Sequence, residues 1–215
     1  MGLGKTIQSI AFLYHLFTFE NVKGPFLVIA PLSTLEHWKR TVEEWTNMNC
    51  ILYYDQNGQP GRRSIQYYEW YHYNITMRGT TVPSELSKFQ ILITSYEVFL
   101  LDFLDVIMNI PFQFIIVDEA HRLKNKNAKI LSALKRLACK RVLLLTGTPI
   151  QNNTGELWSL LNYIHPEKFT SHDDFRRSFG DLSSKEQVEK LNRILKPYML
   201  RRMKEDVEQS IPPLQ

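Results

Sequence analysis

The chain of 215 residues has little cysteine, and its histidines are not arranged to hold a metal ion. Cys50 and Cys139 lie far apart, and neither belongs to a Cys-x-x-Cys pair. We therefore expect two reduced, buried thiols in an intracellular protein. The six histidines also lack the spacing of metal ligands. The sequence thus gives no indication of a disulfide framework or a zinc site.

Long apolar runs, internal repeats and low-complexity tracts are also missing. No apolar stretch approaches the ~20 residues needed to span a bilayer, and no signal peptide is visible. Hydrophobic residues nevertheless make up 44% of the chain and charged residues 22%, which is typical of a folded domain with a substantial core. The net charge of +4 is compatible with nucleic-acid binding without indicating it. We expect one domain, or one domain with a small appendage.

The first residues form the end of a phosphate-binding loop, Gly2-Leu3-Gly4-Lys5-Thr6. Small residues let backbone N–H groups close around phosphates, Lys5 supplies positive charge for the β- and γ-phosphates, and Thr6 offers a hydroxyl to Mg²⁺. The full pattern requires earlier residues and a strand before Gly2, and only Met1 stands there. Taken alone, the segment is equally compatible with a flexible terminus.

A second motif, Asp118-Glu119-Ala120-His121, follows an apolar run from Phe112 to Val117 that is typical of a buried strand. Asp118 would hold Mg²⁺ through water, and Glu119 would position and deprotonate an attacking water. An acidic pair here could instead be a solvated turn or a helix N-terminus. The two motifs together, in this order, indicate an enzyme that uses ATP and Mg²⁺.

From the first motif to residue 145, strand-like and helix-like segments alternate along the sequence. We predict helices over 6–19, 33–45, 62–73 and 127–137, and strands over 26–30, 50–54, 89–94, 112–117 and 141–145. Residues 56–61 and 78–83 are predicted loops. This alternation predicts an α/β fold, a parallel sheet with helices on both faces. Ligands should lie at the carboxyl ends of the strands, where we find Pro31, Thr94, Asp118 and Thr146.

After Pro149 the pattern changes to helices without intervening strands, over 155–164, 171–179 and 184–195. We therefore predict two parts, an ATP-binding lobe over 1–150 and an all-helical extension over 151–215.

Four further segments carry a family resemblance. They are Ala30-Pro31-Leu32-Ser33-Thr34-Leu35 ending near Trp38, Thr94-Ser95-Tyr96-Glu97, Leu145-Thr146-Gly147-Thr148-Pro149 with Gln151-Asn152-Asn153, and Arg201-Arg202-Met203-Lys204-Glu205-Asp206-Val207. This ordered set resembles the first ATPase lobe of Snf2-family chromatin remodellers, within helicase superfamily 2. The Thr-Gly-Thr-Pro segment is unlike the Ser-Ala-Thr segment of most DEAD- and DEAH-box RNA helicases.

Other segments are most similar to the chromodomain-helicase-DNA-binding (CHD) remodellers. They are Asp118-Glu119-Ala120-His121-Arg122-Leu123-Lys124-Asn125, Gly180-Asp181-Leu182, Leu195-Lys196-Pro197-Tyr198-Met199-Leu200-Arg201-Arg202 and Ile211-Pro212-Pro213. The resemblance implies a RecA-like P-loop lobe, double-stranded DNA and nucleosomes as partners, and a location in the nucleus. One further segment is similar to the branch of the CHD family that carries large C-terminal extensions. It is Arg62-Arg63 followed by Tyr67-Tyr68-Glu69.

The resemblance also implies roles for the matched residues. Lys5, Asp118, Glu119 and His121 would be catalytic, and Thr6 and Asp118 would hold Mg²⁺. His121 with Thr146, Gly147 and Thr148 would couple the nucleotide state to DNA contacts. The residues expected along the DNA backbone are Pro31, Ser33, Thr34, Thr94, Ser95 and Tyr96, together with Trp38.

The same residues have structural alternatives. Ser33 or Thr34 could simply cap the following helix, and core packing is the favoured role for Trp38 and Trp45. The aromatic cluster from Tyr67 to Tyr73 could stack bases, although a packed helix with its polar tips in water is the preferred interpretation. Arg201 and Arg202 are expected to pair with acids rather than with phosphates.

Several parts of a complete motor are expected to lie outside the sequence. The family's second lobe, with its arginine finger, the adenine-recognition segment and the strand before Gly2 are not found in it. We expect this gap to leave a vacant slot beside the Asp118 strand and to uncover Ile115 and Val117. Two hypotheses follow: an ATP-binding lobe of a DNA translocase that remodels nucleosomes, or a truncated, non-catalytic fragment with weak nucleotide or DNA binding.

Overall fold

The computed structural model describes residues 4–75, 81–123, 128–139, 141–147, 154–180 and 185–200. The chain divides into two compact units, one over Gly4–Gly147 and the other from Thr148 onward. Each unit is described by itself. The boundary predicted between residues 150 and 151 lies outside the described residues.

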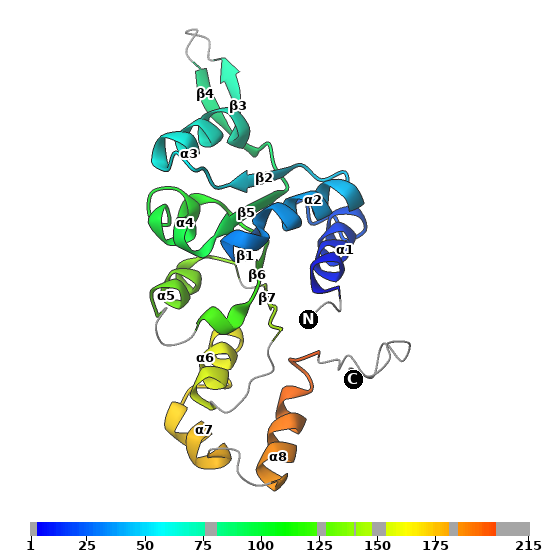
Figure 1. Cartoon of the computed structure of the whole chain (residues 1–215), viewed down its shortest axis with the longest axis vertical. Coiled ribbons are helices and arrows are strands. Elements are labelled where there is room, and N and C mark those ends of the chain that lie inside the picture. The colour runs from blue at the N-terminus through cyan, green and yellow to red at the C-terminus, as the bar shows by residue number, and fades with distance from the viewer. Residues whose placement is uncertain are drawn as a thin grey trace, which may run out of the picture. The chain divides into compact units, whose positions relative to one another are not determined.

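The first unit is built on a five-stranded sheet whose strands all run parallel, in the order β2-β5-β1-β6-β7 (Figure 1). The strands are β1 (Phe26–Ala30), β2 (Cys50–Tyr53), β5 (Ile91–Ser95), β6 (Phe114–Val117) and β7 (Val142–Leu144). Every residue of β1, β5 and β6 is buried. Continuous burial is expected of parallel strands covered on both faces, and it explains why β1 and β6 are entirely apolar and why β5 begins with three apolar residues.

Helices cover both faces of this sheet, as predicted. Figure 1 shows α1 (Lys5–Thr18) and α2 (Leu35–Trp45) on one side, and α4 (Tyr96–Leu101) and α5 (Ala128–Arg136) on the other. On the α1–α2 side, alternate residues of each strand point into one core, since side chains alternate across a strand. The register aligns Phe26 with Ile91 and Phe114 across the three central strands.

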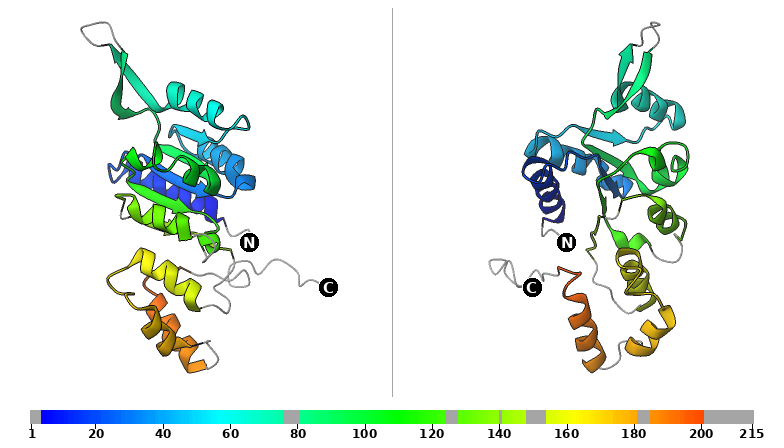
Figure 2. Two further views of the ribbon diagram at one scale, coloured as in Figure 1. Left: turned by 90° about the vertical axis from the view of Figure 1, so that its left-hand side faces the viewer. Right: turned by 180° about the vertical axis from the view of Figure 1, so that it is seen from behind.

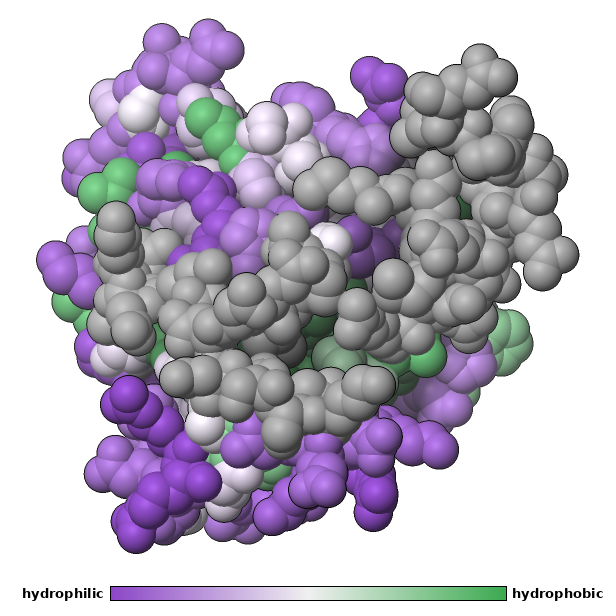
Figure 3. All heavy atoms as spheres, turned by 60° about the horizontal axis from the view of Figure 1, so that its bottom comes forward, coloured by the Kyte–Doolittle hydropathy of each residue, from purple (hydrophilic) through white to green (hydrophobic). Residues whose placement is uncertain are grey.

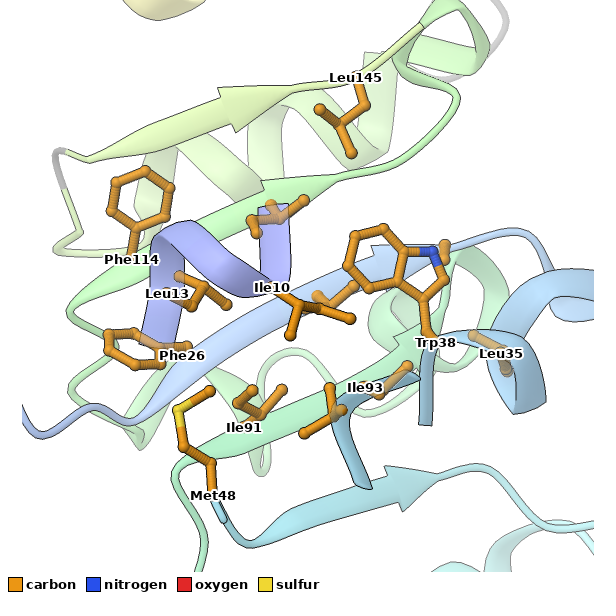
Figure 4. Close-up of a cluster of buried hydrophobic side chains, with 14 residues drawn as sticks. Ile10, Leu13, Phe26, Leu35, Trp38, Met48, Ile91, Ile93, Phe114 and Leu145 are labelled. Atoms are coloured by element: carbon orange, nitrogen blue, oxygen red, sulfur yellow. The ribbon is translucent and has the colours of Figure 1, made fainter. Parts of the chain in front are cut away.

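This core joins the first two helices to the sheet (Figure 4). Ile10 and Leu13 of α1, and Leu35, Trp38 and Val42 of α2, pack on the strands. Trp38, predicted as a core residue, is completely buried, whereas Trp45, predicted likewise, is 62% exposed. The prediction for Trp45 was therefore wrong, because it is the last residue of α2.

The vacant slot predicted beside the Asp118 strand is not there. β6, which leads into Asp118, pairs with β1 on one side and β7 on the other, and Ile115 and Val117 have no exposed surface. The prediction was wrong because it placed the strand before Gly2 next to β6. That position belongs to β7, whose three residues are only half-buried.

The aromatic segment after residue 58 also differs from the prediction. The helix expected over 62–73 is α3 (Gln59–Ile65) followed by a π-helical turn, η2 (Gln66–Trp70). The chain then forms an antiparallel hairpin of β3 (Tyr71–Ile75) and β4 (Thr81–Ser87). The predicted loops over 56–61 and 78–83 therefore include the first residues of α3 and β4. Tyr and other aromatic residues favour strands more than helices, which is the signal that the prediction overlooked.

The start of α2 is a tight turn, η1 (Leu32–Thr34). Thr34 occupies the capping position, but its side chain does not cap the helix. Its hydroxyl instead donates a hydrogen bond of 2.9 Å to the carbonyl of Pro31. A threonine hydroxyl bonds readily to a backbone carbonyl three residues earlier, so the predicted capping role is replaced by closure of the turn.

The second unit is helical in its described residues: α6 (Thr154–Ile164), α7 (His172–Phe179) and α8 (Lys185–Leu195). Its core consists of the side chains Leu157, Leu161, Phe169, Phe175, Phe179, Leu191 and Leu195. The Ser171 side chain caps α7 by accepting a hydrogen bond from the Asp174 N–H.

Figure 3 shows the hydropathy of one face of the protein. On the face in Figure 3, hydrophilic residues dominate and hydrophobic ones form small scattered groups. Among the described helices, none combines the length and apolar character required to cross a membrane.

Candidate functional site

Residues that follow three neighbouring strands meet at one edge of the sheet. Ile29 pairs with Val117, and Val117 pairs with Leu144. Pro31, Asp118 and Leu145 therefore follow β1, β6 and β7 at nearly the same level. Ligands of open parallel sheets bind outside the carboxyl ends of the strands, so this edge is the candidate site.

The first turn of α1 reaches the same edge. Residues 19–25 connect the end of α1 to the amino end of β1, so α1 runs against the strand direction. The Phe12 ring packs edge-on against Phe114, the first residue of β6, with 5.3 Å between ring centroids. Lys5 lies ~10 Å further along the helix axis at ~1.5 Å per residue, and Asp118 lies ~13 Å beyond Phe114 at ~3.3 Å per residue. Figure 2 shows this end of α1 on the side to which the arrowheads point.

The start of α1 has the local geometry of an anion site. Gly4 adopts a left-handed conformation with φ 72°, which suits a residue without Cβ. The first N–H groups of a helix have no intrahelical partners and carry partial positive charge. Lys5 and Thr6 are half-buried in this turn. Gly2 and Leu3, also predicted to bind the nucleotide, lie outside the described residues.

Asp118 is held from three directions. Its Oδ2 accepts a hydrogen bond of 3.0 Å from the Trp38 indole N–H, and its Oδ1 accepts one of 2.9 Å from the Glu119 N–H. The Tyr96 hydroxyl donates to its backbone carbonyl. Asp118 is only 7% exposed, so its orientation is fixed by the protein rather than by solvent.

The donor set fits a magnesium ion. Mg²⁺ prefers oxygen ligands and usually takes one or two carboxylates together with water and substrate phosphates. Each Asp118 oxygen accepts one hydrogen bond from the protein, and an ionised carboxylate has about four lone-pair sites. Asp118 therefore keeps capacity for a metal ligand, with the Thr6 hydroxyl as the second candidate.

Glu119 has an unusual backbone conformation, with φ 50° in the left-handed region. Such conformations are costly for residues other than glycine and concentrate at functional sites. The turn is tied to the neighbouring strand end, because the Ala120 N–H donates a 2.7 Å hydrogen bond to the Leu145 carbonyl. This hydrogen bond to the strand end thus holds the turn in its strained conformation.

The Glu119 carboxylate lies between two of the predicted coupling residues. Its Oε2 is 3.0 Å from His121 Nδ1, although the two groups are not aligned as a hydrogen bond. The Gly147 N–H donates to the same oxygen over 3.4 Å. The structure therefore brings Glu119, His121 and Gly147 together, next to Thr146. Thr148, the remaining coupling residue, lies outside the described residues.

Tyr96 supports the site from the carboxyl end of β5, which lies on the other side of β1 from β6. Burial, followed by the nearby charge of Asp118, raises the pKa of its hydroxyl above the usual value. The hydroxyl therefore stays protonated and can donate to the Asp118 carbonyl. The Arg122 guanidinium lies over the Tyr96 ring at 5.2 Å from the centroid, which adds a cation–π contact.

The residues predicted along the DNA backbone separate into two groups. Ser33 is exposed, and Pro31 and Thr34 are half-buried, so this turn reaches the surface. The side chains of Thr94, Ser95 and Tyr96 are buried.

The buried hydroxyls are engaged inside the protein. Thr94 donates to the carbonyl of Tyr53, and Ser95 caps α4 by accepting a hydrogen bond from the Val98 N–H. Tyr96 and Thr94 therefore give their hydroxyl protons to acceptors inside the protein, whereas Ser95 is buried but keeps its own O–H donor. Small polar residues at strand ends satisfy local backbone groups as readily as ligands, and the sequence does not distinguish the two uses.

The aromatic side chains that follow α3 are partly exposed and partly buried. Tyr67 and Tyr68 are exposed and pack edge to face with 4.9 Å between centroids, whereas Trp70 is buried.

The contact that sequence reasoning missed is the bond from Trp38 to Asp118. Trp38 was predicted to pack in the core, which is correct, but its indole N–H has a second role. A buried tryptophan needs an acceptor for that N–H. A tryptophan that is predicted to be buried near a polar strand end is thus the sequence signal that could have predicted this hydrogen bond.

Comparison with known proteins agrees with this arrangement. The chain matches the SNF2-related domain over residues 1–215. It is 48% identical over 213 residues to human chromodomain-helicase-DNA-binding protein 7, covering 99% of this chain and 7% of that protein. It is 49% identical over 215 residues to the human chromodomain-helicase-DNA-binding protein 8, covering 100% of this chain and 8% of that protein. The chain thus spans less than a tenth of these relatives.

A solved structure supports the same assignment. The Sulfolobus solfataricus SWI2/SNF2 ATPase core in complex with dsDNA aligns with a TM-score of 0.75 and 29% identity, covering 98% of this chain and 40% of that chain. The fold therefore corresponds to part of that ATPase core, as the RecA-like prediction requires. With the motifs at the sheet edge and a match over the whole sequence, the chain belongs to the SNF2-related domain family.

Proposed function

We propose that this chain is the ATP-binding lobe of a nuclear, DNA-dependent ATPase whose full-length protein translocates on double-stranded DNA and remodels nucleosomes. The observation that carries the proposal is the position of Glu119, with its carboxylate beside His121 and Gly147 and its neighbour Asp118 fixed by three hydrogen bonds. The names of the relatives support the chromatin assignment.

The residues at the edge divide the chemistry of ATP hydrolysis. Lys5 and the N–H groups at the start of α1 bind the β- and γ-phosphates. Thr6 and Asp118 would hold Mg²⁺, directly or through water, and the ion would supply positive charge to the phosphates. Glu119 orients a water molecule and accepts its proton. Gly147 and His121, both next to the Glu119 carboxylate, sense the state of the site and relay it to the DNA contacts.

DNA binding is assigned to the exposed turn after β1. Pro31, Ser33 and Thr34 lie at the same sheet edge as the catalytic acids. The exposed Ser33 hydroxyl would bind a phosphate, which positions DNA without reading its sequence, and the Thr34 hydroxyl would hold the turn that presents it. The second lobe of the ATPase would complete the DNA channel and supply an arginine to the transferred phosphate.

The proposal is tested by replacing the base without changing its shape. Glu119→Gln in the full-length protein should retain ATP binding and slow hydrolysis by about 10²–10⁴-fold, because an amide cannot accept the proton. Glu97→Gln, an exposed glutamate at the start of α4, is the matched control and should leave turnover unchanged. Near-normal turnover of Glu119→Gln, with ATP binding intact, would remove Glu119 as the base.

A further inference from the structure

We propose that Trp38 is a positioning residue for the metal-binding carboxylate, and that its indole N–H sets the orientation of Asp118 in which Mg²⁺ binds. The inference rests on the proposed function, since it assigns Asp118 to the metal. It adds a residue from α2 to a site otherwise formed by the strand ends and by α1.

The contact joins two distant parts of the sequence. Trp38 Nε1 lies 3.0 Å from Asp118 Oδ2, across a separation of 80 residues. The Trp38 side chain has no exposed surface, and its ring is packed among core residues that include Ile10 and Leu145. Figure 4 shows the indole nitrogen on the side of the ring away from Ile10. A ring packed in this way cannot turn its N–H toward another acceptor without disturbing the core.

The acceptor is the informative part of this bond. A buried indole N–H requires a partner, but any backbone carbonyl would satisfy it. Here the partner is a carboxylate oxygen that the metal site also needs. The bond therefore restrains a functional side chain, in addition to satisfying the tryptophan.

Two donors acting on two oxygens fix the rotation of a carboxylate. Trp38 holds Oδ2 while the Glu119 N–H holds Oδ1. With both oxygens restrained, the remaining lone pairs of Asp118 point in set directions. Without the indole N–H only Oδ1 keeps a donor, and the carboxylate gains rotational freedom that a metal must remove on binding. Partners that orient metal ligands typically contribute 10–100-fold to metal affinity.

The place of Trp38 in the fold gives the contact a second meaning. Trp38 lies on α2, one helical turn after Thr34. Thr34 belongs to the turn that we assign to DNA contact. A rigid helix therefore connects this surface turn to the carboxylate. Movement of α2 on DNA binding would change the position of the indole N–H at Asp118.

The test removes the N–H and keeps an aromatic ring, although a smaller one, at this position. In the full-length protein, Trp38→Phe should weaken the apparent Mg²⁺ affinity about 10–100-fold. The readout is the Mg²⁺ dependence of fluorescent ADP binding, together with the Mg²⁺ dependence of kcat. Trp45→Phe is the matched control, because Trp45 lies on the same helix and is exposed; its Mg²⁺ dependence should equal that of the wild type.

Loss of packing has to be separated from loss of the bond. Replacing Trp38 with 3-benzothienylalanine, which exchanges the N–H for sulfur in a ring of the same shape, keeps the core filled if phenylalanine does not fold. The unfolding midpoint of this variant should stay close to that of the wild type while its Mg²⁺ affinity falls. Equal Mg²⁺ affinity in a folded benzothienyl variant would overturn the inference.

A double substitution completes the test. Asp118→Asn alone should weaken Mg²⁺ affinity, and adding Trp38→Phe should then cause no further loss if Trp38 acts through Asp118. Additive losses would show a separate, structural effect and would overturn the inference. If Asp118→Asn left the Mg²⁺ dependence unchanged, the metal assignment in the proposed function would fail as well, so the two failures are distinguishable.

Discussion

Arg62 and Asp102, 40 positions apart in the sequence, form a buried ion pair through two hydrogen bonds of 2.7 and 3.0 Å. The Tyr53 hydroxyl donates to the same carboxylate over 2.5 Å, and the Gln66 amide donates to that hydroxyl. The four side chains connect α3 and η2 with β2 and the end of α4. This network fastens the hairpin-bearing segment to the sheet.

Breaking the pair should destabilise the first unit. Arg62→Ala leaves the Asp102 charge buried without its main partner, and we expect the free energy of unfolding to fall by about 3–5 kcal/mol. The neighbouring Arg63 is exposed, so Arg63→Ala should change stability by less than about 0.5 kcal/mol. Urea unfolding of both variants provides the comparison. Equal stability would show that solvent replaces the guanidinium.

The same pair predicts a response to acid. Burial of Asp102 acts to raise its pKa, but the hydrogen bonds from Arg62 and Tyr53 outweigh this and lower it. A lowered folded-state pKa contributes stability that is fully present above the unfolded value of about 3.9 and is lost as the pH falls through the folded value. The stability difference between wild type and Asp102→Asn should therefore shrink below about pH 4. A constant difference down to acid unfolding would contradict it.

Lys5 should be required for hydrolysis. Lys5→Met keeps the length of the side chain but removes the charge expected at the β- and γ-phosphates, and turnover in the full-length protein should fall by at least ~10². Lys39→Met is the control, since Lys39 forms a surface pair with Glu43 away from the strand ends. Wild-type turnover of Lys5→Met would show that α1 does not bind the phosphates.

DNA binding should depend on the turn after β1. Replacing Ser33 and Thr34 together by alanine should weaken binding to duplexes of any sequence by a similar factor, since backbone contacts carry no sequence information. Ser64→Ala changes an exposed serine in α3 and should have no effect. Affinity should also decrease steeply with salt in all variants. A loss confined to particular sequences would point to base contacts instead.

Cys50 should be unreactive in the folded protein. Burial, assisted by the charge of Glu43, raises the pKa of its thiol to about 12. Because the thiolate is the reactive form, iodoacetamide at pH 8 should leave Cys50 unmodified until the protein unfolds. Mass spectrometry after alkylation with and without urea measures this. Rapid labelling without urea would mean that β2 opens in the native state.

The local elements were the easiest part of the fold to predict from the sequence. β1 was predicted to the residue, because five apolar residues lie between Gly24-Pro25 and Pro31. The hairpin of β3 and β4 was missed because aromatic residues there satisfied a helical pattern. Strand order was also misjudged, since parallel pairing joins segments far apart in the sequence and leaves no local signal.

The candidate site shows the same division. Asp118 and Glu119 were proposed from their motif, because metal-assisted phosphoryl transfer needs acids at a strand end, and their roles stay predictions. The bonds that orient them, from Trp38 and Tyr96, depend on how helices pack and were not predicted. The burial of Thr94 likewise depends on its bond to Tyr53 in the adjacent strand.

The central position of β1 determines when the protein can fold during its synthesis. β1 is complete at residue 30, but its two neighbours are completed only at residues 95 and 117. At roughly 5–20 residues per second, a ribosome needs roughly 4–17 seconds to make the intervening chain. Until β5 is complete at residue 95, an entirely apolar strand has no partner, which favours aggregation. Nascent chains of intermediate length are therefore expected to be clients of ribosome-associated chaperones.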